Sequence, residues 1–168
     1  PDLVASLRPH TGLPFEIHLM TTAPTAWIDP FADAGADAII ICFDSTDDPG
    51  AVLAAIKARG LQTGVSLLLE EEIDLLDPHW EQLDILTLLQ TPAGIKGADM
   101  DERAPGRIRR ARTEIDRRGV ATAIEADGGI RRHTVPQIAA AGANYIVPGS
   151  LMFGEDPQEM RAWLAGLG

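Results

Sequence analysis

At 168 residues, the chain has the length of one domain and is long enough to bury a hydrophobic core. Its formal net charge of −11 argues against nucleic acid or an anionic membrane as a partner, because both are negatively charged. No apolar run approaches the roughly 20 residues of a membrane span, and the single cysteine, Cys42, excludes an internal disulfide and fits a reducing compartment. We therefore expect one cytoplasmic domain over residues 1–168.

Apolar segments and amphipathic segments alternate along the chain. Helices are predicted at residues 2–8, 24–34, 48–59, 70–76, 105–118, 134–141 and 157–164, with a short helical turn at 80–83. Strands are predicted at residues 15–20, 38–43, 62–69, 84–89, 120–126 and 144–147. Most of the helices end at a glycine, which permits the left-handed backbone that commonly terminates a helix.

This alternation predicts a parallel sheet, because a strand, a helix and a further strand connect most readily with parallel strands and a right-handed crossover. Six such units are compatible with a doubly wound sheet or with most of an eight-stranded barrel, and periodicity does not separate the two. The residues at the strand ends favour the barrel, where functional groups come from the tips of several strands.

The most informative stretch is residues 120–130, a run of small and apolar residues that ends in Asp127, Gly128 and Gly129. A carboxylate at the tip of a barrel strand is placed for chemistry, and the glycines let backbone N–H groups approach an anion. For this stretch taken alone, a plain Asp-Gly turn is the favoured alternative. Its functional interpretation depends on residues elsewhere in the chain.

A second candidate is His18, near the end of the first predicted strand, with Met20 on the same face two residues later. A histidine in an apolar strand is more often a core residue than a functional one. At a shared barrel mouth, however, His18 and Asp127 would combine an imidazole and a carboxylate, which suit Zn²⁺, Mn²⁺ or Fe²⁺. Two ligands do not make a closed site, so the metal signal from these residues alone is weak.

Three glycine-containing segments follow predicted strands and indicate a phosphate site. They are residues 94–97 with Gly94 and Gly97, then Gly128-Gly129, and then Gly149-Ser150. Barrels of this kind hold phosphate at the loops after their last two strands. Ser150 adds a hydroxyl donor and Lys96 a positive charge. Each glycine pair alone is more often a turn, but together and in this order they predict phosphate binding.

Other candidate groups have simpler interpretations. Cys42 lies in a buried strand without a basic neighbour in the sequence, which is typical of a small core residue. The arginine-rich residues 107–112 are most simply the solvated face of a helix, paired with Glu114 and Asp116. A Walker loop and the CxxC and GxSxG motifs are absent from the sequence, so the strand ends remain the candidates for function.

Four segments of the chain resemble ribulose-phosphate 3-epimerase, a TIM barrel of the pentose phosphate pathway. The family's LRPHT…VHLM passage, from helix 2 to strand 3, is similar to LRPHTGLPFEIHLM at residues 7–20, and its next helix is similar to PTAWIDPFADAGAD at 24–37. The EVDGGI of strand 7 is similar to IEADGGI at 124–130, and the AGAD…VAGSAIF of strand 8 to AGANYIVPGSLMFG at 141–154. The resemblance implies a parallel (β/α) TIM-type barrel with six of its eight strands in this chain.

The resemblance also implies an isomerase that epimerises C3 of a ketose phosphate, of the ribulose 5-phosphate and xylulose 5-phosphate type. In that family one carboxylate removes the C3 proton, a divalent metal steadies the enediolate, and a second carboxylate returns a proton on the opposite face. Asp127 matches an acid/base that is also a metal ligand, and His18 matches a second metal ligand. The positions that match substrate contacts are His18, Met20, Gly94, Gly97, Gly128, Gly129, Gly149 and Ser150. The implied cofactor is a divalent metal, Zn, Mn or Fe, and the implied partner is a phosphorylated ketose.

The chain departs from the family at several places. Strands 1 and 2 are absent, and with them a His, an Asp and a substrate-binding Ser, while the strand-4 His appears as Cys42. A non-catalytic phosphosugar-binding or assembly protein is therefore the alternative. An aldolase or decarboxylase would need a lysine at a strand tip, for which Lys96 is the candidate. Open edges at residues 15–20 and 144–147 further predict a homo-oligomer.

Overall fold

The computed structural model describes residues 1–95, 97–154 and 156–166. Six strands form one sheet in which each strand pairs in parallel with the next along the chain. They are β1 (Glu16–Leu19), β2 (Ala38–Cys42), β3 (Gln62–Leu67), β4 (Ile85–Leu89), β5 (Ala123–Asp127) and β6 (Tyr145–Val147). The α-helices are α1 (Asp2–Leu7), α2 (Thr25–Ala34), α3 (Pro49–Ala58), α4 (Ala104–Arg118), α5 (Val135–Ala141), α6 (Ser150–Phe153) and α7 (Pro157–Ala165).

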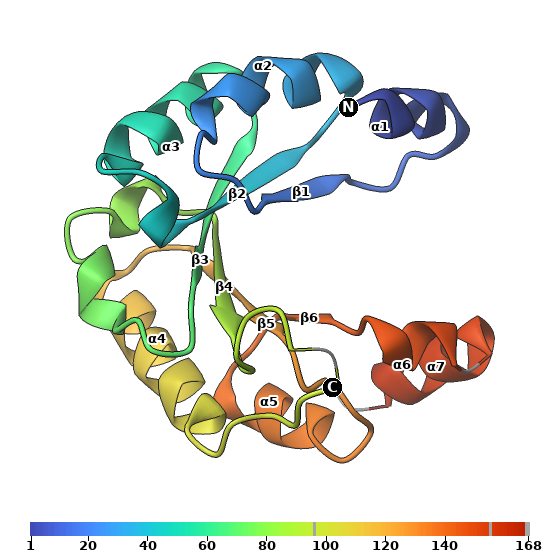
Figure 1. Ribbon diagram of the computed structural model, residues 1–168. Coiled ribbons are helices and arrows are strands. Elements are labelled where there is room, and N and C mark those ends of the chain that lie inside the picture. The colour runs from blue at the N-terminus through green and yellow to red at the C-terminus, as the bar shows by residue number, and fades with distance from the viewer. Residues whose placement is uncertain (96, 155, 167–168) are drawn as a thin grey trace.

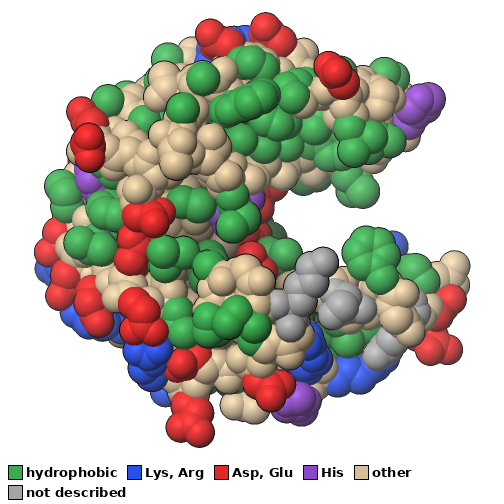
Figure 2. All heavy atoms as spheres, in the orientation of Figure 1, with side chains coloured by type: hydrophobic (Ala, Val, Ile, Leu, Met, Phe, Trp, Pro, Cys, Tyr) green, Lys and Arg blue, Asp and Glu red, His purple; other side chains and the backbone are tan. Residues whose placement is uncertain are grey.

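The sheet curls into a partial (β/α) barrel that is open on one side. Figure 1 shows helices around the outside of the curved sheet and an opening between β1 and β6. In the space-filling view the opening is a deep notch with acidic side chains visible at its base (Figure 2). Within the described residues, β1 pairs only with β2 and β6 only with β5. The predicted parallel barrel with six strands is thereby confirmed.

The hydrophobic core lies between the sheet and its outer helices. Alternate strand residues such as Ile39, Val65 and Leu86 point outward and pack into one large buried cluster with helix residues such as Ile56 and Ile108. The inner face has a much smaller apolar cluster, formed by Ala38, Ile40 and Ile85. Most of the buried apolar area therefore comes from helix–sheet packing, which does not depend on closure of the barrel.

A single glycine makes the inner cluster possible. Gly64 of β3 lies beside Ile40 of β2 and Ile85 of β4 in the strand register. A Cβ at Gly64 would lie 2.6 Å from Cγ1 of Ile40 and 3.2 Å from the Ile85 carbonyl oxygen. The two isoleucines therefore meet across a position that only a residue without a side chain fits.

The segment after β3 differs from the expected helix at residues 70–76. It forms the 3₁₀ turns η3 (Ile73–Leu76) and η4 (Trp80–Gln82) in place of an α-helix, and only the second of these was predicted. The three-residue spacing of Ile73 and Leu76, both buried, matches the period of a 3₁₀ turn. Pro78 has no N–H to continue the hydrogen bonding. Two further 3₁₀ turns, η1 (Arg8–His10) and η2 (Phe43–Ser45), were also not predicted.

Arg107 is not part of a solvated helix face, contrary to the expectation for residues 107–112. Its guanidinium donates to the carbonyl oxygens of Leu89, Leu68 and Glu71 at 2.8 to 2.9 Å. Arg110, by contrast, pairs on the surface with Glu72 and Asp74, acids outside its own helix. Arg107 therefore ties the loops after β3 and β4 to α4. None of the helices in the described part of the chain is long and apolar enough to cross a bilayer.

Replacing Arg107 with Met should lower the free energy of unfolding by about 2 kcal/mol, because three partly buried carbonyls lose a charged donor. Thermal or urea unfolding measures the effect. Arg109→Met is the matched control, since Arg109 is exposed on the same helix. Equal stability of the two variants would contradict the role given to Arg107.

The open edges at β1 and β6 should cause self-association, because unpaired strand edges pair readily with other chains. Light scattering over a dilution series should give a mass above that of the 168-residue chain, falling as the protein is diluted. A monodisperse monomer throughout the series would contradict the expectation of a homo-oligomer.

Candidate active site

The carboxyl ends of the parallel strands meet at one rim of the barrel, where His18 of β1 lies on the inner face. Its Nε2 is 2.9 Å from the hydroxyl oxygen of Ser66 on β3 and 3.7 Å from the sulfur of Cys42 on β2. Cys42 is buried, as expected of a core residue, but its thiol faces this cluster. Burial is the main cause that raises the Cys42 pKa, so the thiol form is favoured over the thiolate.

Asp127 ends β5 on the same inner face and interacts with His18. Burial lowers the pKa of His18, and the Asp127 carboxylate partly offsets that effect. Burial likewise raises the pKa of Asp127, which His18 and the backbone N–H of Gly128 partly oppose. The structure thus brings together the two residues that the sequence placed at separate strand ends. A carboxylate of raised pKa is a stronger base at neutral pH.

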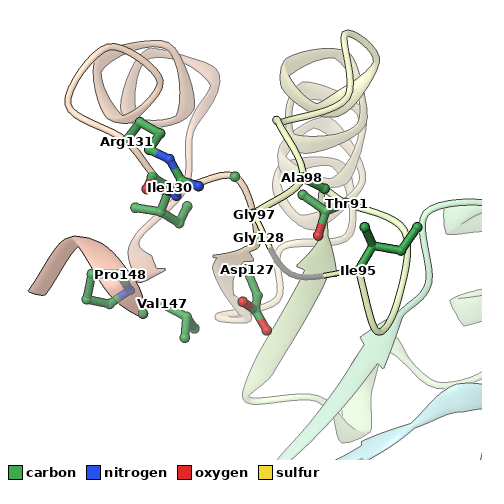
Figure 3. A pocket seen from close by; sticks show the side chains of 12 residues that line it. Thr91, Ile95, Gly97, Ala98, Asp127, Gly128, Ile130, Arg131, Val147 and Pro148 are labelled. Carbon is green, nitrogen blue, oxygen red and sulfur yellow. Dashed lines mark hydrogen bonds between the residues drawn. The ribbon is translucent and has the colours of Figure 1, made fainter. Parts of the chain in front are cut away.

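The glycine loops after β5 and β6 share a pocket with Asp127. Figure 3 shows this pocket, whose walls include Gly128, Gly129 and Gly149, with Gly97 contributed by the loop after β4. All four glycines have positive φ, between 48° and 95°. A Cβ at Gly129 would lie 2.5 Å from the backbone nitrogen of Met100, so the loops approach too closely there for a side chain.

An adjoining apolar pocket contains two further residues that the sequence indicated. Met20 and Gly94 line it together with Leu89, Ile95 and Asp127, which it shares with the first pocket. The Met20 side chain is 68% exposed. Asp127 therefore has the glycine loops on one side and apolar side chains on the other. Lys96 and the side chain of Ser150 lie outside the described part of the structure.

Sequence reasoning missed a pair of carboxyl groups on the inner face of the barrel, the buried Glu125 of β5 and the exposed Glu16 of β1. Glu125 is only 6% exposed, and its Oε1 accepts a hydrogen bond of 3.0 Å from the hydroxyl of Thr87. Burial, with the charge of Glu16 as the second cause, raises the Glu125 pKa to about 7. Burial also raises the pKa of Glu16, whose carboxylate accepts a hydrogen bond from Glu125. The available signal was a charged residue between Ile124 and Ala126 in an apolar strand, two positions before Asp127.

This pair should make stability depend on pH. The Glu125 pKa is higher in the folded state than the ordinary value of 4.5, so the folded protein binds more protons between pH 4.5 and about 7. Stability should therefore fall as pH rises through that window, by at most about 3 kcal/mol in total. Glu125→Gln should flatten the dependence, because an amide keeps the hydrogen bonds without titrating.

Urea unfolding at pH values from 4.5 to 8 measures this slope. Glu102→Gln, at an exposed acid, is the control and should leave it unchanged. An unaltered slope in Glu125→Gln would show that the Glu16–Glu125 pair is not the cause.

Comparison with known proteins gives a family for this arrangement. The sequence pattern of the ribulose-phosphate 3 epimerase family matches residues 1–153. The chain belongs to this family. Ribulose-phosphate 3-epimerase from Bacillus subtilis is 29% identical over 160 residues, covering 95% of this chain and 74% of that protein. The enzyme of the same name from Mycobacterium tuberculosis is 33% identical over 158 residues, covering 92% of this chain and 67% of that protein.

These comparisons confirm the resemblance seen in the sequence, and the relatives are isomerases by name. The chain spans about two thirds to three quarters of their length. Among solved structures, the tryptophan synthase alpha-subunit from Pyrococcus furiosus is similar, with a TM-score of 0.69 over 99% of this chain and 68% of that chain. At 17% sequence identity, this similarity shows the barrel fold alone.

The resemblance in the sequence implied a divalent metal held by His18 and Asp127. His18 and Asp127 suit such an ion in kind, since imidazole nitrogen and carboxylate oxygen are common ligands. They do not suffice in number, because the described residues include no group of three His, Cys, Asp or Glu side chains placed to hold a metal. Any complete metal centre would therefore need donors in addition to those two.

Proposed function

We propose that this chain carries the phosphate-binding loops and one acid/base of a ketose-phosphate 3-epimerase. The observation that supports the proposal most strongly is the shared pocket, in which Asp127 lies beside three glycine loops. A ketose phosphate bound with its phosphate at the glycine N–H groups would extend its carbon chain toward that carboxylate. Met20 and the apolar side of the site would then pack against the sugar carbons.

The chemistry that fits Asp127 is transfer of the C3 proton. The hydrogen on the carbon next to a ketone is acidic because its removal gives an enediolate, and a carboxylate of raised pKa can accept it. A divalent metal, if bound at His18 and Asp127 with additional ligands, would stabilise the negative charge that develops on oxygen. Inversion at C3 also requires an acid on the opposite face.

Asp127 is the one carboxylate among the described residues that line these two pockets. The Glu16–Glu125 pair lies two residues deeper along β1 and β5 and is not among the pocket residues. The second acid of an epimerase is therefore expected outside these two pockets. This observation also favours the second candidate function, a phosphosugar-binding protein that does not catalyse epimerisation.

The aldolase or decarboxylase alternative has little support. The sequence contains two lysines, Lys57 and Lys96. Lys57 lies on the outer helix α3, away from the strand tips where a Schiff-base lysine of a barrel enzyme would be expected. Lys96 lies outside the described residues.

Exchange of the C3 proton of ribulose 5-phosphate with D₂O tests the proposal. We expect no exchange by the 168-residue chain, and exchange by a fusion that adds the first two βα units of the Bacillus subtilis relative before Pro1. In that fusion, Asp127→Asn should reduce exchange by more than the roughly 10²- to 10⁴-fold typical of general acid–base catalysis, because a metal ligand is lost as well. A chelator should likewise abolish exchange.

Two controls sharpen this experiment. Asp116→Asn, on the outer helix α4, should retain exchange, whereas Ser150→Ala should mainly raise KM because the phosphate is remote from C3. Wild-type exchange in Asp127→Asn would overturn the assignment of the acid/base. Sugar-phosphate binding without exchange in the unmodified fusion would favour the binding protein instead.

A further inference from the structure

We propose that Arg131 supplies the positive charge that binds the phosphate dianion in the pocket between the β5 and β6 loops. This inference rests on the proposed function, because it assigns one more phosphate-binding residue to the same pocket. Arg131 lines the pocket together with Gly128, Gly129 and Gly149. Figure 3 shows Arg131 and Ile130 on one wall, with the loop that carries Thr91 and Gly97 on the other side.

The backbone of Arg131 is already engaged, so its contribution to a ligand must come from the side chain. Its N–H donates to the hydroxyl oxygen of Thr134 at 2.8 Å. That hydroxyl in turn lies 2.9 Å from the carbonyl oxygen of Gly129, and Thr134 is only 5% exposed. The buried threonine thus fixes the turn after the two glycines and leaves the Arg131 side chain at the pocket wall.

The guanidinium of Arg131 is held next to the glycine turn. Its Nη1 donates to the carbonyl oxygen of Ile130 at 2.8 Å. A guanidinium has five N–H groups in a rigid planar fork. One of them donates to the carbonyl, and the N–H groups that remain can bind phosphate. The following arginine has a different position, because the guanidinium of Arg132 lies 4.8 Å from the centre of the Trp163 ring on α7.

Electrostatics give the reason why a cation is needed here. Asp127 lines the same pocket, and the chain carries a formal net charge of −11, so a phosphate dianion approaches an unfavourable field. Glycine N–H groups offer only partial charges. Arg131 is the one cationic side chain among the described residues of this pocket, and it can offset the repulsion directly.

Binding of inorganic phosphate to the 168-residue chain, measured by calorimetry at low ionic strength, tests the inference. Arg131→Met should raise the Kd by about 10- to 100-fold, the range expected for loss of charge-assisted hydrogen bonds. Arg131→Lys should recover part of the affinity, since lysine keeps the charge without the fork. Arg109→Met removes an exposed arginine on α4 and should change the Kd by less than about twofold.

The salt dependence provides a second readout that a structural role would not alter. The Kd of the wild-type chain should rise more steeply with salt than that of Arg131→Met, because one fixed charge is missing from the variant. Thermal unfolding of every variant checks that the fold is retained.

The outcomes separate this inference from the proposed function. Absence of phosphate binding by the wild-type chain would overturn the phosphate pocket itself, and this inference with it. Equal affinities of wild type and Arg131→Met would overturn the role of Arg131 alone. Loss of binding in both Arg131→Met and Arg131→Lys, with a lowered unfolding midpoint in both, would also overturn it by showing that Arg131 supports the loop.

Discussion

The parallel register of the six strands is the constraint on which the site depends. Each strand pairs with its successor, so all six carboxyl ends reach the same rim of the barrel. Period-two alternation then decides which side chains face inward, and it places His18, Ser66 and Asp127 on the same side of the sheet. A shift of one residue in β5 would move Asp127 to the helix-covered face and Ala126 to the rim. The chemistry of the site therefore depends on the register of strand pairing as much as on residue identity.

Much of the fold was predictable because its signals are local. Apolar runs and glycines located all six strands, and their alternation with helices indicated a parallel barrel. The turn at Ile73–Leu76 was not predictable from the acidic composition of residues 70–76, because burial of Ile73 and Leu76 selected a short 3₁₀ turn in place of an α-helix. Helix α6 was also missed, since four residues are too few to show a helical period.

The candidate site was predictable only in part, since sequence gives strand-end residues but not what lies across the barrel. Asp127 and His18 could be found from their positions. The hydrogen bond between Glu125 and Thr87 and the charge of Glu16 next to it depend on strand pairing and curvature. The contacts of Arg107 could not be predicted either. An arginine that binds carbonyl groups of distant segments has the same helical spacing as one that faces solvent.

The order of the strands has a consequence for how the molecule can form and change. Among the described residues every strand pairs only with the strands next to it in the chain, which keeps contact order low for a parallel sheet. Each βα unit packs its own outer helix or turn against the sheet, next to the helix or turn of the preceding unit, and so extends the same buried layer. The architecture is therefore modular, as in a linear repeat array: units at either end can be gained or exchanged by recombination while the layer behind them remains packed.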